Sequence, residues 1–596
     1  MWYNISNWRC FVMRLKVSKS KNAASFYVIK SIYNSKTQKN TSVVVEKLGT
    51  EASLREKLGG QDPYEWAKEY VAEINRKEKE DSRQVLVKRR QSKRIPKDTQ
   101  QSFNGGYLFL QDIYHQLGID KISKEISSKY KFTYDLDGIL SRLLYGRILF
   151  PSSKLNTFEL SKTLLETVPF ELQHVYRGLE VIAKESDFLQ SSVYRNSLEI
   201  SKRNDKILYY DCTNYFFEIE QESGLKQYGP SKEHRPNPLV EMGLFMDGDG
   251  IPLAFSIHSG NTNEQQTLQP LEKQIMKDFS LSKFVVCTDA GLSSAANRKF
   301  NSKQDRAFIT TQSLKKLKVH LKDWALSPEG WHLVGSSESF NIDTLQQSNQ
   351  LRELYRKATF YKERWINENG LEQRLIVTFS LKYQDYQRTI RNRQIDRALT
   401  LIEKAPAILK KHRQTDYKRF VEQTSLTDDG EIAEKKVYQI NEDKIQNEEI
   451  YDGFYGVCTN LEDKVEAIIQ INHRRWEIEE NFRLLKTDFR ARPVYLSRDD
   501  RIKAHFTTCF LALVLYRYLE KQLKEEFTSS EIISQLKEMN FYHVPSEGYI
   551  PTYTRTDFTD ALHESFGFNT DYEIVSTKNM KKIFKKTKNG KKVRKK

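Results

Sequence analysis

The feature that most constrains the fold is a series of strand-like runs in the second quarter of the chain. Each run is rich in β-branched and aromatic side chains, which is typical of buried strands. The runs are residues 207–220, 239–246, 251–258 and 284–288. Asp247-Gly248-Asp249-Gly250 predicts a hairpin turn between the second and third runs, and a helical pattern over 264–279 separates the third from the fourth. We therefore expect an α/β fold with a mixed sheet and flanking helices.

Two of these runs carry a carboxylate in an unusual place. Asp211 lies in the middle of the first run, and Asp289 directly follows the fourth. Burying an acid costs free energy unless it is paired, hydrogen-bonded or bound to a cation. Ligands of open α/β sheets bind at the edge where such strands end. Taken alone, each aspartate is more often a cap or turn residue. The order of strand, hairpin, helix and acid-tipped strand is that of a ribonuclease H-like core.

A third carboxylate comes from residues 464–486, which lack Pro and Gly and are expected to form one helix. At 100° per residue, Glu479 lies about 40° and Lys486 about 20° from Arg475, so one acid and two bases form a stripe beside an apolar face. The alternative is an ordinary amphipathic helix whose Arg475–Glu479 pair contributes roughly 0.3–0.5 kcal/mol if exposed.

Together these residues predict a metal site. We expect Asp211, Asp289 and Glu479 to converge, because carboxylate oxygens are the ligands that Mg²⁺ and Mn²⁺ prefer. Two such ions about 3.5–4 Å apart activate a water or a 3′-hydroxyl and stabilise the leaving oxygen during displacement at phosphorus. Arg475 and Lys486 would supply positive charge for the phosphates.

The same residues carry a family resemblance. Arg475-x3-Glu479-x6-Lys486 is similar to the Tyr-x2-Arg-x3-Glu-x6-Lys signature of DDE transposases from bacterial insertion sequences. Residues 228–236, 250–264 and 288–294 resemble that family's blocks around its first and second aspartates. The resemblance covers roughly residues 200 to 525. Two positions depart from the family pattern: Asn472 replaces the signature's Tyr, and Asn237 stands where relatives carry Asp.

The resemblance implies a ribonuclease H-like catalytic domain and cut-and-paste movement of an element from its terminal inverted repeats. It implies Asp211, Asp289 and Glu479 as the catalytic triad, holding two Mg²⁺ ions, with Mn²⁺ as a substitute. The side chains expected to contact DNA phosphates are Arg475, Lys486, Asn472, Lys232 and Arg235.

We divide the chain into six regions. They are an N-terminal β-hairpin and helix module with a basic linker (1–100), a helical and DNA-binding region (101–203), the first part of the ribonuclease H-like core (204–316), an inserted subdomain (317–455), the second part of the core (456–527), and a C-terminal region (528–596). Residues 578–596 hold eleven Lys or Arg and no acid. That composition predicts a disordered tail that adds salt-sensitive affinity for DNA.

Two tryptophans of the inserted subdomain are candidates for base stacking. In the family this insertion holds the DNA end, so Trp365 or Trp331 can stack on a displaced base, which is worth about 1–3 kcal/mol. The alternative for either tryptophan is packing in the core.

The composition agrees with a nucleic-acid partner. The formal net charge is +17 and the pI about 9.2, which favours an acidic polymer over a membrane surface. The five cysteines show no CxxC spacing, so neither a disulfide framework nor a zinc knuckle is indicated. No apolar run is long enough to span a bilayer. We expect a cytoplasmic protein of the bacterial cytosol or nucleoid, without a membrane partner.

The predicted function is that of a DNA transposase that cleaves and transfers strands at terminal inverted repeats. Its expected partners are double-stranded DNA, as repeats and as target, and a second copy of the chain in an active homodimer. Two alternatives remain open: a transposase-derived DNA-binding protein without catalysis, and a stand-alone ribonuclease H-like nuclease.

Overall fold

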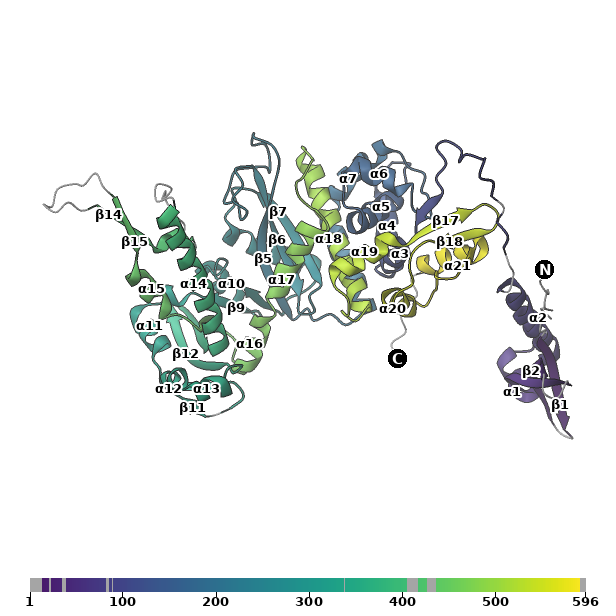
Figure 1. Cartoon of the computed structure of the whole chain (residues 1–596), viewed down its shortest axis with the longest axis horizontal. Helices are drawn as coiled ribbons and strands as arrows, with labels where there is room; N and C mark the ends of the chain where they lie inside the picture. The colour runs from purple at the N-terminus through teal and green to yellow at the C-terminus, as the bar shows by residue number, and fades with distance from the viewer. Residues whose placement is uncertain are drawn as a thin grey trace. The chain divides into compact units, whose positions relative to one another are not determined.

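The computed structural model of the chain describes residues 13–20, 23–34, 39–81, 85–87, 89–336, 338–404, 416–425 and 436–589. The chain separates into two compact units, Met1–Thr99 and Gln100–Lys596, and each is described by itself (Figure 1). None of the helices in these ranges is long and apolar enough to cross a membrane.

The N-terminal unit is a three-stranded antiparallel sheet with two helices. Its elements are β1 (Met13–Ser20), β2 (Ala23–Asn34), β3 (Lys39–Thr50), α1 (Glu51–Leu58) and α2 (Pro63–Asp81). β2 and β3 form the expected hairpin, whose tip lies outside the described residues, and α2 is the helix that follows it. Phe26 and Leu54 lie in the small core, and Leu15 and Val17, on alternate positions of β1, pack against it.

The central sheet of the second unit has the topology of a ribonuclease H-like core, as the element order predicts. Its strands are β5 (Ile207–Phe216), β6 (Leu239–Asp247), β7 (Pro252–Ser259), β8 (Val285–Thr288) and β9 (Ala307–Gln312). They lie in the order β7-β6-β5-β8-β9. β6 and β7 run antiparallel to their neighbours, whereas β8 is parallel to β5 and β9 to β8. The crossovers are α9 (Leu268–Asp278) and α10 (Ala295–Asn301).

The inserted region extends this sheet. β16 (Phe454–Thr459) pairs antiparallel with β9, and the order then continues through β13 (Leu371–Phe379), β12 (Phe360–Glu368), β10 (Trp331–Leu333) and β11 (Ser339–Phe340). The other elements are α11 (Val319–Leu326), α12 (Ile342–Gln347), α13 (Asn349–Leu354), α14 (Leu381–Lys404), β14 (Val421–Ser425), β15 (Lys436–Ile440) and α15 (Glu442–Glu449). The insertion has its own hydrophobic cluster, so it is joined to the core by backbone pairing and still packs around a separate interior.

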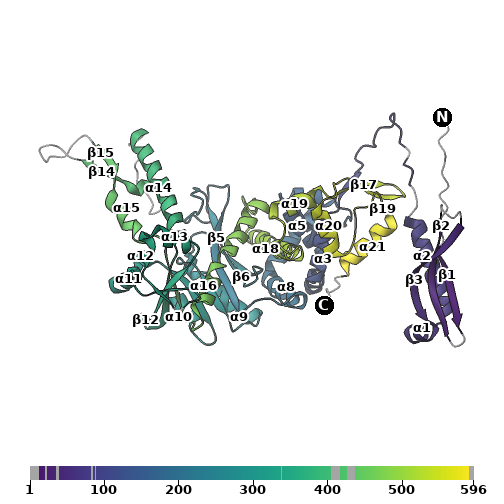
Figure 2. The same ribbon diagram turned by 60° about the horizontal axis from the view of Figure 1, so that its bottom comes forward.

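Residues 101–203 are helical, as expected. The helices are α3 (Tyr107–Gln116), α4 (Ile119–Lys129), α5 (Leu136–Leu149), α6 (Lys154–Ser161), α7 (Leu172–Lys184) and α8 (Ser186–Ile200). α3, α5 and α7 pack against the long helix α18 (Asp499–Gln522), and α18 also contacts β7. Figure 2 shows α18 beside α3 and α5. One hydrophobic cluster spans the helical region, α18 and the sheet, so the helices belong to the same body as the core.

The C-terminal region corrects one prediction. It contains α19 (Ser529–Glu538), β17 (Asn540–Val544), β18 (Gly548–Pro551), α20 (Asp557–Phe566), β19 (Val575–Ser576) and α21 (Thr577–Lys588). β17 pairs with β4 (Ser102–Asn104), which joins this region to the start of the helical region. A disordered tail from residue 578 is wrong as far as Lys588, because α21 buries Met580 and Ile583. Residues 590–596 lie outside the described residues.

Candidate functional site

Asp211 and Asp289 occupy matching positions on neighbouring strands. β5 and β8 pair in parallel with Tyr209 opposite Cys287. Two residues further along each strand direction, Asp211 and Asp289 therefore reach the same level of the sheet, on the same face as that pair. The aspartates are close enough for the charge of Asp289 to raise the pKa of Asp211.

The environment of Asp211 leaves its negative charge incompletely balanced. The side chain is half-buried, and its Oδ1 accepts a hydrogen bond of 2.7 Å from the backbone N–H of Cys212. Burial raises the pKa of Asp211 to about 6, and Asp289 adds to the rise, although the charges of Lys232 and Arg475 oppose it. A bound cation would stabilise the ionised form of both carboxylates.

Asp289 is fixed by a turn. Its Oδ1 accepts a hydrogen bond from the backbone N–H of Leu292 at 3.0 Å, and its own carbonyl accepts one from Thr310 Oγ1 at 3.2 Å. The turn role that the sequence left open is therefore present. It does not exclude a ligand role, because a carboxylate has two oxygens and about four lone-pair sites.

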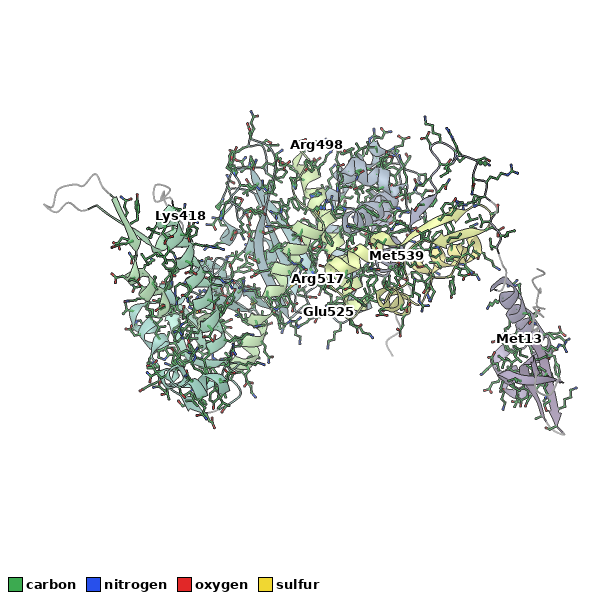
Figure 3. All side chains as sticks on the ribbon, viewed as in Figure 1. Met13, Lys418, Arg498, Arg517, Glu525 and Met539 are labelled. Atoms are coloured by element: carbon green, nitrogen blue, oxygen red, sulfur yellow. The ribbon has the colours of Figure 1, made fainter. Side chains whose placement is uncertain are left out.

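The helix expected over 464–486 is interrupted, which corrects the prediction of one continuous helix. α16 (Val465–His473) ends before α17 (Trp476–Arg483) begins, and a wide π-helical turn over Leu484–Asp488 follows. Asn481 of α17 accepts a hydrogen bond of 2.7 Å from Nε of Arg517 on α18. Figure 3 labels Arg517 among the side chains of the chain. A 100° helical wheel does not hold across these two irregular turns, so the predicted stripe of Arg475, Glu479 and Lys486 is not a straight row.

Glu479 lies apart from a compact carboxylate cluster. Its side chain is 62% exposed, and its Oε1 lies 3.7 Å from Nη1 of Arg475. Within the ranges that the structure describes, no three His, Cys, Asp or Glu side chains are grouped closely enough to hold a metal ion. The register of β5 and β8 brings Asp211 and Asp289 to the same level of the sheet, and the convergence of Glu479 with them stays a prediction.

The donor set fits hard divalent cations even so. Asp211 and Asp289 offer carboxylate oxygens at the same level of neighbouring strands. Burial, and after it the charge of Asp289, raises the pKa of Asp211, and a bound cation would oppose both effects. Arg475 links these residues to Glu479, because its charge lowers the pKa of Asp211 while its guanidinium pairs with Glu479.

Two basic residues border the aspartates. Lys232 Nζ donates a hydrogen bond to the carbonyl of Cys212 and lies 2.9 Å from Oε1 of Glu264. Lys486 is largely buried, and its Nζ lies 3.5 Å from Oε1 of Glu233. Burial lowers the pKa of Lys486 to about 8, with a further contribution from Lys232.

Glu241 is a site residue that the sequence reasoning missed. It lies on β6 opposite Asn214 of β5 and is 3% exposed. Burial raises the pKa of Glu241 to about 7, and the charge of Glu264 adds to this rise while Lys232 opposes it. An acid inside the apolar run LVEMGLF is the signal that identified Asp211, and it could have identified Glu241 too.

The other expected phosphate contacts are spread around this group. Asn472 Nδ2 lies 3.4 Å from the hydroxyl of Tyr455, to which it donates, so the Asn at the signature's Tyr position contacts a tyrosine from β16. Arg235 is exposed and its guanidinium lies 4.7 Å from the centroid of the Phe216 ring.

The two tryptophans have different environments. Trp331 is fully buried, and its Nε1 donates a hydrogen bond of 2.9 Å to the carbonyl of Ser327, so in this structure it packs in the core and cannot stack on a base. Trp365 on β12 is 46% exposed and lines a pocket of about 590 Å³ together with Arg364 and Arg374. Its surface is accessible to a partner.

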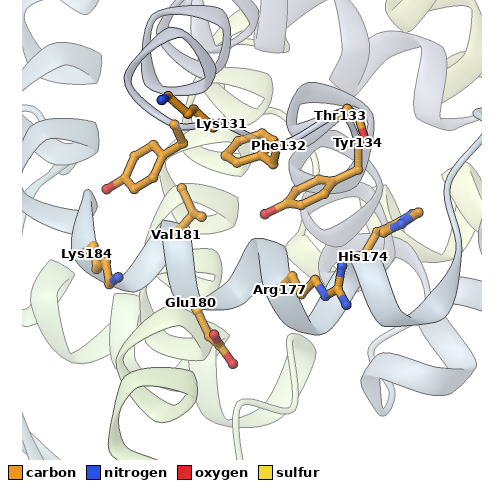
Figure 4. Close-up of a pocket in the computed structure, with 10 residues that line it drawn as sticks. Lys131, Phe132, Thr133, Tyr134, His174, Arg177, Glu180, Val181 and Lys184 are labelled. Carbon is orange, nitrogen blue, oxygen red and sulfur yellow. The ribbon is translucent and has the colours of Figure 1, made fainter.

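A different kind of pocket lies in the helical region. It encloses about 390 Å³ between residues 130–134 and α7, and Figure 4 shows the rings of Phe132 and Tyr134 beside each other at its wall. These rings are stacked with centroids 4.2 Å apart. Glu180 is the acid that lines it, and it pairs with Arg498 and Arg501. This pocket lacks the adjacent carboxylates of the Asp211 site.

The chain matches a known protein family over about half of its length. Residues 216–515, which are 300 of the 596, match the family model described as the transposase DDE domain. Asp289 and Glu479 lie inside the match, and Asp211 lies five residues before it. A comparison with curated protein sequences finds no match.

Among solved structures, a piggyBac transposase synaptic complex with hairpin DNA is 8% identical, covers 73% of this chain and 80% of its own, and has a TM-score of 0.34. A Mos1 transposase paired-end complex with the left transposon end is 15% identical, covers 42% of this chain and 68% of its own, and has a TM-score of 0.13.

Proposed function

The chain belongs to the transposase DDE domain family, and on that premise we propose that Asp211, Asp289 and Glu479 are its catalytic carboxylates. The protein is a DNA transposase, an enzyme that acts on DNA by phosphoryl transfer. The observation that carries the assignment of residues is the pairing of β5 with β8, which aligns Asp211 with Asp289.

Asp211 and Asp289 would hold divalent cations, with Mg²⁺ preferred, Mn²⁺ as a substitute, and two ions in the complete site. When bound, such ions activate the attacking water or 3′-hydroxyl and stabilise the leaving oxygen. Glu479 would complete the ligand set from α17. Its exposed side chain and its position on the short helix α17 leave it free to reorient.

The basic residues around the carboxylates would position the DNA. Arg475 lies near enough to both aspartates for their charges to interact with its own, and its guanidinium can grip a phosphate with two N–H groups. Lys486 and Lys232 would approach neighbouring phosphates, and the lowered pKa of Lys486 would return toward its usual range beside an anion. Asn472 and Arg235 would extend this contact along the strand.

We assign the substrate as the terminal inverted repeats of an insertion sequence, joined to target DNA by a homodimer. Two ends must be held in one complex for both to be transferred, which requires at least two active sites. Trp365 would stack on a base displaced from the cleaved end, because it is an exposed ring in the insertion.

A plasmid assay tests this function. Supercoiled DNA with an element between its inverted repeats is incubated with the protein and Mg²⁺, and we expect excised element and joined products. Asp211→Asn and Asp289→Asn should abolish both products while DNA affinity, measured by fluorescence anisotropy, stays within about two-fold. Asp305→Asn is the matched control, because Asp305 is an exposed acid paired with Lys283. Cuts without joining would indicate a nuclease, and binding without cuts would indicate a non-catalytic protein.

A further inference from the structure

A strongly cationic pocket lies where the helical region meets the segment that follows α17. It encloses about 320 Å³. Its basic lining comes from α5, the start of α6, the loop after the π-helical turn, and α18. These basic side chains are Arg147, Lys154, Arg490, Arg492 and His505. No aspartate or glutamate belongs to the described lining, although Arg492 pairs with Glu233 outside it.

Of these residues, Lys154 gives the strongest indication that the pocket binds an anion. It is the first residue of α6, and its side chain is only 5% exposed. Among the described residues it forms no hydrogen bond and no ion pair. A buried ammonium without a partner is costly, so buried charges in folded proteins are normally paired. In agreement, burial lowers the pKa of Lys154 to about 7, and the neighbouring Arg147 lowers it further.

The walls of the pocket are fixed without any ligand. Arg147 is buried, and its guanidinium donates hydrogen bonds to the carbonyls of Phe489, Arg490 and Ser152 at 3.1 to 3.3 Å. His505 Nε2 lies 3.0 Å from the carbonyl of Ala491, to which it donates. Arg490 adopts a left-handed backbone with φ of 45°, which is uncommon for a residue other than glycine. A loop held in this way is pre-organised to bind a ligand.

We propose that this pocket binds a phosphate group, and that DNA supplies it. The chemistry fits, because an ammonium, guanidinium groups and the N-terminal N–H groups of a helix are the usual donors to phosphate oxygens. The inference that DNA supplies this phosphate rests on the proposed function. A continuous series of charged side chains supports it: Glu233 pairs with both Lys486, beside the carboxylates, and Arg492, in the pocket wall. A strand leaving the carboxylates can thus follow these cations into the pocket.

Replacing Lys154 by Met tests the proposal in the full-length protein. Met has a similar length and no charge, so the folded state should be at least as stable as the wild type. In buffer without divalent cations, duplex DNA should bind roughly ten-fold more weakly by fluorescence anisotropy, which corresponds to one lost charge-assisted contact. The plot of log affinity against log salt concentration should become shallower by about 0.9, as expected for one phosphate contact fewer.

The matched control is Lys162→Met, which removes the same charge at the other end of α6. Lys162 is exposed and pairs with Glu159, so its loss should change the slope less than the loss of Lys154. Arg490→Asn is a second variant of the pocket. Asn tolerates a left-handed backbone, so this change removes an exposed charge from the rim and should also weaken DNA binding. It keeps the test valid if Lys154→Met fails to fold.

Inorganic phosphate distinguishes the two sources of the group. At constant ionic strength, phosphate should raise the melting temperature of the wild type relative to chloride and should not raise that of Lys154→Met. If phosphate stabilises the wild type but Lys154→Met binds DNA with unchanged affinity and slope, the pocket takes free phosphate and DNA is overturned as its source. The whole proposal is overturned if phosphate does not raise the melting temperature of the wild type and Lys154→Met binds DNA as the wild type does. A wild type that binds DNA without cleaving it would refute the proposed catalysis and leave this inference intact.

Discussion

Nη1 of Arg475 lies 3.7 Å from Oε1 of Glu479, while the charge of the same guanidinium lowers the pKa of Asp211. Arg475 thus connects the outlying carboxylate with the two aspartates aligned on β5 and β8. We expect it to balance the charge of the site before DNA arrives and to bind phosphate afterwards, and this double role has a measurable consequence.

Arg475→Ala should shift the pH dependence of DNA cleavage. Burial already raises the pKa of Asp211 to about 6, and Arg475 opposes that rise, so its removal should raise this pKa further. Because the ionised carboxylate is the form that binds metal, the acidic limb of the pH–rate profile should move to higher pH. We also expect a loss of about 10²-fold at the optimum, where a phosphate contact is missing. Rates on a duplex with a pre-nicked end, measured from about pH 5.5 to 9, give both the position of the acidic limb and the rate at the optimum.

The neighbouring arginine is the control for this variant. Arg474 pairs with Glu477 at 2.8 Å and is not among the main influences on the pKa of Asp211, so Arg474→Ala should leave the acidic limb in place. An equal displacement in both variants would contradict the role of Arg475.

Glu272 allows a test of pH-dependent stability away from the site. It is fully buried in α9, and its Oε1 accepts a hydrogen bond of 2.8 Å from Asn301 Nδ2. Burial raises the pKa of Glu272 from about 4.5 to about 8. The folded state therefore binds the proton more tightly than the unfolded state, so stability falls as the pH rises from about 4.5 to about 8.

Glu272→Gln removes that penalty and keeps an oxygen for Asn301. The variant should match the wild type near pH 4.5 and unfold at a higher temperature near pH 9, where the gain is at most about 5 kcal/mol. Thermal melting followed by circular dichroism at both pH values checks this. Glu218→Gln, at an exposed position, should melt like the wild type at both, and an identical response of the two variants would contradict the burial argument.

The elements that the sequence predicts correctly are those set by the local pattern of residue types. The strands around Asp211 and Asp289 follow from β-branched and aromatic runs, and their order is enough to predict the ribonuclease H-like sheet. Tertiary contacts decided the rest. The break between α16 and α17 has no Pro or Gly to mark it, and the extension of the sheet through β16 depends on pairing between residues about 150 positions apart, such as Thr459 and Ile309.

The positions of the carboxylates relative to one another also depend on tertiary contacts. Sequence reasoning can identify an acid in an apolar strand, but whether three acids from distant segments meet depends on the tertiary fold. Glu479 was placed by a helical wheel that assumes one unbroken helix, whereas the structure divides that segment into α16, α17 and a π-helical turn. For Trp331 the structure selects core packing, one of the two alternatives, because a single tryptophan gives no sign of which face of a strand will be covered.

The tryptophans should separate stability from function. Trp365→Ala should lower strand joining about ten-fold by removing a stacking surface, with little change in melting temperature. Trp331→Ala should instead destabilise the insertion by about 3–5 kcal/mol, because it empties a buried site. Joining assays and thermal melts on both variants distinguish the effects. Unchanged cleavage and joining by Trp365→Ala would refute base stacking there.

The final prediction concerns α21, where a basic sequence forms a docked helix. Met580 is fully buried where α21 packs against α3 and β18, whereas Lys581 beside it is exposed. Met580→Ala should weaken this docking by about 2–5 kcal/mol, and Lys581→Ala should change it by less than about 0.5 kcal/mol. Trypsin cuts after lysine, so limited proteolysis within residues 577–588 reports how often α21 undocks. The Met580 variant should be cut faster there, with the rest of the chain initially intact. Equal rates for wild type and both variants would mean that α21 is not held by its buried face, and that the basic composition dominates after all.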